Sequence, residues 1–251
     1  MPTPIDELVA LLDAHDVKPD ATRLRARTYE LLAITPDAVM ADVGCGTGRA
    51  VAEMAALGAH AIGVDLNERM LATAHDRFAE GDFRLGDAAA LPFRDGELRG
   101  YRADKVLHAL PEPERAVAEA WRVLAPGGRA VLCGQDWDTF VVDSAHPELT
   151  RAIVHARADR VATPRAARRY RNLLLGAGFR DAAVEVHTTV LTGADALPVL
   201  AKLVEACRAG GDVTDAEAGA WLADQRERAA DDRAFLAFPI FIASATRPPS
   251  P

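Results

Sequence analysis

The chain has 251 residues, of which 49% are hydrophobic and 26% are charged, and its formal net charge is −8 at pH 7. This composition is typical of one large globular α/β domain, and it excludes a membrane-spanning protein because no apolar stretch approaches the ~20 residues that cross a bilayer. The acidic balance argues against nucleic acid as a partner, because phosphate binding needs a basic face, and it favours a small molecule.

The N-terminal residues 1–35 are expected to form two helices. Thr3 as N-cap, Pro4 and Asp6 predict the start of the first helix, and the second is expected over residues 21–33. The stretch MPTPIDELVA lacks the basic and apolar regions of a signal peptide, so we expect a cytoplasmic protein.

From residue 36 to about residue 140, apolar strands alternate with helices. This alternation indicates βαβ units in a parallel, doubly wound sheet. The expected strands lie at 38–43, 60–65, 82–87, 97–103 and 129–135, and the expected helices at 48–58, 68–79 and 113–124.

The C-terminal part has a different residue composition. Residues 141–180 are rich in helix formers, and Thr163 with Pro164 predicts the start of a second helix there, which ends at Gly176. Residues 181–190 alternate as a strand, Thr214 and Glu217 predict a capping box, and 235–246 is expected to be the last strand.

The segment 189–234 is too long for a simple hairpin between the last two strands. Such an insertion would form an apolar wall that selects the substrate, or it would equally form packing against the sheet or a homodimer contact with a second copy. Its apolar residues are Leu197, Leu200, Leu203, Val204 and Trp221.

The stretch MADVGCGTGRAV, residues 40–51, places a glycine-rich loop directly after the first expected strand. In a dinucleotide-binding fingerprint the third glycine comes three residues after the second, to let the helix pack against the strand. Arg49 stands at that position here, and the third glycine is Gly48. A nicotinamide dehydrogenase is therefore disfavoured.

The chain contains the pattern DxGxGxG, then VD at the end of the second expected strand, GD at the end of the third, and LAPGGR at 124–129. Together these motifs resemble the class I S-adenosylmethionine-dependent methyltransferases. The resemblance covers about residues 36–135. The segments ALPF and VLHALPEPERAVAEAWRVLAPGG are similar to the small-molecule branch that includes the ubiquinone and menaquinone biosynthesis methyltransferases. That branch often has a histidine pair where this chain has His108 followed by Ala109.

The resemblance implies S-adenosyl-L-methionine as cofactor, S-adenosyl-L-homocysteine as product, and a role for each matching residue. Asp65 would accept the ribose hydroxyls, with Leu66 against the adenine face, while Asp87 and the Ala88 amide would bind the adenine edge. The other residues expected at the cofactor are Gly44, Cys45, Gly46, Gly48, Ala103 and Arg25. Arg25 would clamp the cofactor carboxylate, unless the helix of Arg23, Arg25 and Arg27 presents a solvated face.

Three side chains are candidates for a general base: His108, Asp136 and Asp138, which follow the fourth and fifth strands. A structural role is the alternative for His108, and fixing of the loop for the two aspartates. Arginines at 165, 168, 169 and 171 would attract an acidic substrate or form a solvated face. We expect no metal, because no His, Cys or Asp cluster has ligand spacing.

We therefore expect a single methyltransferase domain over residues 1–251, with a cofactor-binding core at 36–140 and helical substrate-cap elements at 141–180 and 189–234. The resemblance implies the strand order 3-2-1-4-5-7-6 with the last strand antiparallel. The expected function is methylation of a small, partly hydrophobic acceptor at O, C or N. The alternatives are another enzyme on the same fold, such as a cyclase, and a non-catalytic cofactor-binding protein.

Overall fold

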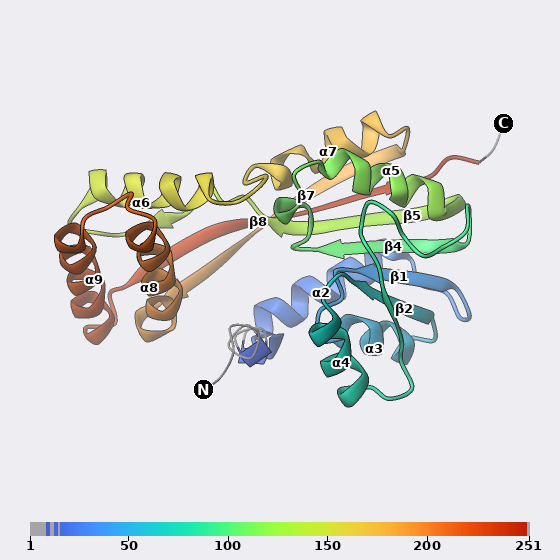
Figure 1. Ribbon diagram of the computed structural model, residues 1–251, viewed down its shortest axis with the longest axis horizontal. Coiled ribbons are helices and arrows are strands. Elements are labelled where there is room, and N and C mark those ends of the chain that lie inside the picture. Colours follow the sequence, from blue (N-terminus) through green and yellow to red (C-terminus); the bar gives the residue numbers. More distant parts are fainter. Residues whose placement is uncertain (1–8, 11–12, 15, 250–251) are drawn as a thin grey trace.

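The computed structural model describes residues 9–10, 13–14 and 16–249, and these residues form one mixed sheet flanked by helices (Figure 1). The residues predicted to start the first helix, Thr3, Pro4 and Asp6, lie outside this part. The order of the sheet is β3-β2-β1-β4-β5-β8-β6, and β7 pairs with β8. The strands are β1 Val39–Val43, β2 His60–Asp65, β3 Asp82–Leu85, β4 Leu98–Asp104, β5 Leu124–Gln135, β6 Val141–Val142, β7 Arg180–Thr192 and β8 Phe235–Thr246.

The doubly wound fold predicted from the sequence is confirmed. The sixth and seventh strands of the predicted order correspond to β7 and β8, and β8 runs antiparallel to both β5 and β7. The short strand β6 was not predicted; it pairs with Leu236 and Ala237 at one end of β8. The parallel strands β1 to β5 have their carboxyl ends at one edge of the sheet, because Val43 is in register with Val64 and Ala103.

Helices cover both faces of the parallel part (Figure 1). Tyr29, Met54 and Leu71 belong to the core on one face, and Val117, Tyr170 and Leu174 to the core on the other. The helices are α2 Pro19–Leu32, α3 Arg49–Ala56, α4 Glu68–Arg77, the short 3-10 helix η1 Leu107–Ala109, α5 Pro113–Val123, α6 Pro147–Asp159, α7 Ala166–Gly176, α8 Gly193–Ala209 and α9 Asp215–Ala230. No helix among the described residues has the length and apolarity needed to cross a bilayer.

Two helix starts test the predicted caps. The capping box of α9 is confirmed, because Thr214 Oγ1 accepts from Glu217 N and the Glu217 side chain accepts from Thr214 N. The predicted start of α7 at Thr163 is wrong by two to three residues. Thr163 N donates to His108 O and Thr163 Oγ1 donates to Leu110 O, so this residue is tied to η1 and the helix begins at Ala166.

Helices α6, α8 and α9 form a separate layer beyond the carboxyl ends of β4 and β5 (Figure 1). Four of the apolar residues predicted as a wall, Leu200, Leu203, Val204 and Trp221, are at most 4% exposed and pack into the core of this layer. Trp221 Nε1 also donates to Thr150 Oγ1 at 2.9 Å, which fixes α9 to α6. Their apolar surface is therefore used for packing, as the second interpretation of the insertion expects.

Candidate active site

The glycine-rich loop follows β1 at the carboxyl edge of the sheet, and its three glycines all have positive φ angles. A Cβ atom at Gly44 would overlap Val106, and one at Gly48 would lie 2.6 Å from Phe83 Cζ. At Gly46 a Cβ would have no neighbour within 4 Å. Gly44 and Gly48 thus allow the loop to pack against the protein, whereas Gly46 faces open space and leaves room for a ligand to approach the backbone.

Asp65 ends β2 beside this loop and is fixed by two backbone donors. Its Oδ2 accepts from Gly46 N at 2.9 Å and its Oδ1 accepts from Asn67 N at 2.8 Å. Each carboxylate oxygen has more than one lone-pair direction, so both can accept a further hydrogen bond. The neighbouring side chain, Leu66, is 70% exposed and is free to cover an apolar ligand face.

The other residues predicted for the cofactor lie along the same edge. Asp87 is exposed and uses Oδ1 to accept from Ala89 N at 2.8 Å. Ala88 and Ala103 are buried, so only their backbone can meet a ligand. Cys45 is also buried, and burial raises the pKa of its thiol, which therefore stays protonated.

Arg25 does not present a solvated face, because it is 7% exposed. Its Nε and Nη2 donate to the two carboxylate oxygens of Glu53 at 3.0 and 3.1 Å, and its Nη1 donates to Asp16 O at 3.1 Å. The structure thus gives Arg25 a protein carboxylate as its partner, where the sequence suggested a cofactor carboxylate. This bidentate pair ties α2 to α3.

A buried ion network under the loop was missed by the sequence analysis. Arg102 on β4 donates to Asp42 Oδ1 at 2.7 Å, to Asp104 Oδ2 at 2.8 Å and to Thr28 Oγ1 at 2.9 Å. The sequence signal was a pair of charged residues, Arg102 and Asp104, at the end of a strand expected in a parallel sheet, where strands are usually apolar.

Asp104 has one oxygen that the protein does not satisfy. Its Oδ1 is buried and has no hydrogen-bond partner among the described residues, and Lys105 Nζ lies 3.9 Å from it. Although burial opposes ionisation, the charges of Lys105 and Arg102 lower the pKa of Asp104, so it is a carboxylate. An unsatisfied carboxylate oxygen at the end of β4 fits a cationic group such as the ammonium of S-adenosylmethionine.

The two aspartates predicted as candidate bases are both paired with arginines at the start of α7, Arg165 as its N-cap and Arg168 in its first turn. Asp136 is fully buried and accepts from Arg168 Nε and Nη2. Asp138 accepts from Arg165 Nε at 2.9 Å, and this hydrogen bond lowers the pKa of Asp138. The contacts match the loop-fixing alternative, and they show Arg165 and Arg168 engaged with protein carboxylates.

His108 lies in η1 near the end of β4. Burial, together with the charges of Arg157 and Lys105, lowers the pKa of His108 to about 4, so its imidazole is neutral at pH 7. Its Nδ1 is buried without a hydrogen-bond partner in the described part of the chain. The ring centroid lies 5.6 Å from that of Trp137, which follows β5.

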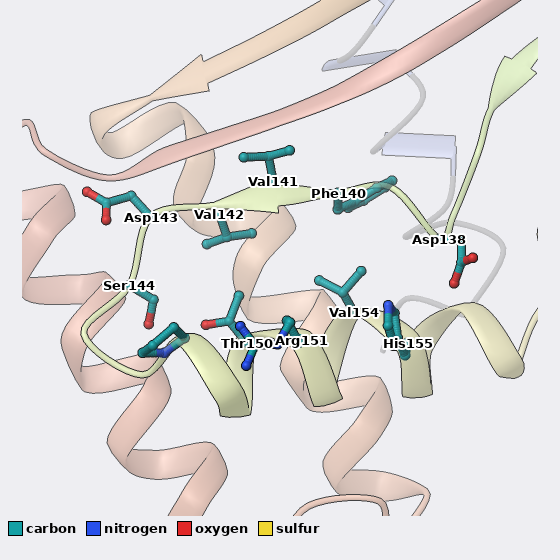
Figure 2. A pocket seen from close by; sticks show the side chains of 11 residues that line it. Asp138, Phe140, Val141, Val142, Asp143, Ser144, Thr150, Arg151, Val154 and His155 are labelled. Atoms are coloured by element: carbon teal, nitrogen blue, oxygen red, sulfur yellow. The ribbon is translucent and has the colours of Figure 1, made fainter.

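A cavity of about 400 Å³ opens between the segment 138–144 and helix α6 (Figure 2). Phe140, Val142 and Val154 give it apolar walls, and Asp138 and His155 stand at one end. The complete lining is Asp138, Phe140, Val141, Val142, Asp143, Ser144, Pro147, Thr150, Arg151, Val154 and His155. This size is within the range of small-molecule sites.

A family model described as a methyltransferase domain matches residues 41–132. An uncharacterised 37.1 kDa protein of transposon Tn4556 from Streptomyces fradiae is 33% identical over 70% of this chain and 54% of its own length. The demethylmenaquinone methyltransferase of Clavibacter sepedonicus is 39% identical over 37% of this chain and 39% of its own length.

The chain thus spans about half, or less, of the length of these two curated relatives. A solved structure from Bacillus halodurans superposes with a TM-score of 0.62 at 20% identity, over 89% of this chain and 98% of that one, which supports the fold alone. The residues that match the methyltransferase domain model include the glycine-rich loop and Asp65 of the candidate site. Over residues 41–132 the chain is therefore similar to the methyltransferase domain family.

Proposed function

We propose that the chain transfers a methyl group from S-adenosyl-L-methionine to a small, partly hydrophobic acceptor, at O, C or N. The observation that carries this proposal is the Asp65 carboxylate, held by Gly46 N next to a loop whose glycine faces open space. A carboxylate that is held in place beside accessible backbone groups is suited to bind a ribose that is attached to a polar chain.

Different residues at the strand ends would bind different parts of the cofactor. The backbone at Gly44, Cys45, Gly46 and Gly48, with Ala103, would enclose the methionine half, and Asp104 Oδ1 would accept from its ammonium. Asp65 would bind the ribose, Leu66 would cover the adenine, and Asp87 with the Ala88 amide would bind the adenine edge. Arg25 is not needed in this set, because Glu53 already compensates its charge.

When bound, the cofactor supplies an electrophilic methyl group on a sulfonium that leaves as a neutral thioether. The chain's own task is therefore to align the acceptor and to exclude water, which can account for roughly 7 kcal/mol or more of the barrier. Asp136 and Asp138 are paired with arginines and are poor bases. Among the three candidates, His108 alone is left to take a proton, and its low pKa makes it a weak base.

We expect calorimetry to show binding of S-adenosylmethionine and S-adenosylhomocysteine and no binding of NAD. With an acceptor, the homocysteine product should form in step with the methylated product. Binding of NAD alone would overturn the proposal. Binding without turnover across a broad acceptor panel would favour the non-catalytic alternative, and acceptor conversion without S-adenosylhomocysteine would favour the cyclase.

Asp87→Asn should reduce the affinity for S-adenosylhomocysteine by roughly tenfold, because a neutral amide replaces a charged acceptor at the adenine amino group. The matched ligand is an analogue that lacks this amino group, which should bind the wild type weakly. If the wild type binds both ligands equally, Asp87 does not contact the amino group.

A further inference from the structure

Arg157 on α6 is a half-buried guanidinium without a counter-ion. It makes no hydrogen bond or ion pair among the described residues. Every other buried or half-buried arginine of this part is paired with a carboxylate or a backbone carbonyl: Arg25, Arg27, Arg49, Arg84, Arg102, Arg122, Arg129, Arg228 and Arg247. A charge that is partly removed from water without a partner is costly, so its retention indicates a ligand.

The position of Arg157 is held by aromatic rings. Its Cζ lies 4.4 Å from the centroid of the Trp137 ring, in a cation–π contact. Trp137 stacks on Phe140 with centroids 5.6 Å apart, and Phe140 stacks on Phe238 at 4.9 Å. A ring contact of this kind engages the face of the guanidinium and none of its N–H donors.

The surroundings of Arg157 are short of negative charge. Asp136 and Asp138, the acids nearest to Trp137 in the chain, are already paired with Arg168 and Arg165. The charge of Arg157 also helps to lower the pKa of His108, after the larger effect of burial. The same strand ends carry further buried polar atoms without partners in the described part, namely His108 Nδ1, Trp137 Nε1 and Gln135 Oε1.

The cavity of Figure 2 lies along α6, and Phe140, Val142 and Val154 form the apolar part of its lining. Thr150 and Val154 line the cavity of Figure 2, and Arg157 continues their series at i, i+4 and i+7, on the same face of the helix. A molecule with an apolar body in this cavity could therefore extend a charged group towards Arg157.

We propose that Arg157 anchors a carboxylate of the methyl acceptor, so that the acceptor is an organic monoanion with an apolar body. This rests on the proposed function. One guanidinium offers two parallel N–H donors and one charge, which match a single carboxylate.

The test compares benzoate with benzamide, which have the same shape and differ in charge. Their dissociation constants are measured on the full chain by ligand-observed NMR, with and without saturating S-adenosylhomocysteine. The wild type should bind benzoate about tenfold more tightly than benzamide, and Arg157→Gln should bind the two about equally. Arg157→Lys should keep part of the preference. The matched control is Arg226→Gln, which removes an exposed arginine of α9 and should behave as the wild type.

Equal binding of the two probes by the wild type would overturn the inference. It would also be overturned if Arg157→Gln, shown to be folded by its thermal transition, kept the preference. Binding of S-adenosylhomocysteine should be the same in Arg157→Gln and wild type. If the nucleoside binds neither protein, the proposed function fails, and the benzoate preference without nucleoside still decides the role of Arg157.

Discussion

Replacing Arg102 by methionine should lower the free energy of unfolding by about 3–5 kcal/mol, the cost of breaking a buried ion pair from one side. Arg102 and Asp42 have side chains that are each 3% exposed, and Asp104 is 18% exposed. Methionine fills a similar volume but leaves both carboxylates buried without their common counter-ion. Urea denaturation at pH 7 measures the loss.

The matched control is Arg208→Met, which also removes an arginine between two carboxylates. Arg208 pairs with Glu205 and Asp215 on the surface, where water and salt screen the charges, so this variant should be nearly as stable as the wild type. Equal losses in the two variants would contradict a special role for burial at Arg102.

The stability lost on replacing Arg102 by methionine should be smaller in acid than at pH 7. The pKa of Asp104 is lowered in the folded chain, so its contribution to stability is present above the unfolded pKa of about 4 and is lost as the pH falls below it. The difference between wild type and Arg102→Met should therefore narrow in acid. A difference that stays constant down to pH 3 would show that lost packing, and not charge, causes the effect.

The parallel part of the fold could be predicted because its signals are local. Strand β2 lies at His60–Asp65, as expected, since the apolar run ends in an aspartate that starts the next turn. The glycine-rich loop likewise lies directly after the first strand, as expected, and its residues Gly44, Gly46 and Gly48 adopt the positive φ angles that glycine tolerates.

Side-chain pairing could not be predicted, because it depends on residues far apart in the chain. Periodicity allows Arg25 to face the protein, but it cannot identify Glu53, 28 residues away, as its partner. Asp136 is separated by 32 residues from Arg168, whose contact turns a candidate base into an ion pair. That Arg157 lacks a counter-ion could not be predicted either, because this depends on all the residues that pack around it.

Asp65→Ala should weaken the binding of S-adenosylhomocysteine by about hundredfold, because two hydrogen bonds to a charged acceptor, each worth roughly 1.5 kcal/mol or more, are lost. The same carboxylate holds Gly46 N and Asn67 N, so some of the loss could come from a loosened loop. Asp65→Asn addresses this point, since its amide oxygen can still accept from one backbone donor. Calorimetry on both variants gives the affinities.

The contribution of the ribose contact is separated from loosening of the loop by a second ligand that lacks the 2′-hydroxyl. The wild type should bind the complete nucleoside more tightly than the 2′-deoxy analogue, whereas Asp65→Ala should bind the two equally. A looser loop would weaken both ligands in proportion and would leave their ratio unchanged. If Asp65→Ala keeps the wild-type ratio, Asp65 only shapes the loop around Gly46, and the ribose must find its acceptor at another residue of the strand ends.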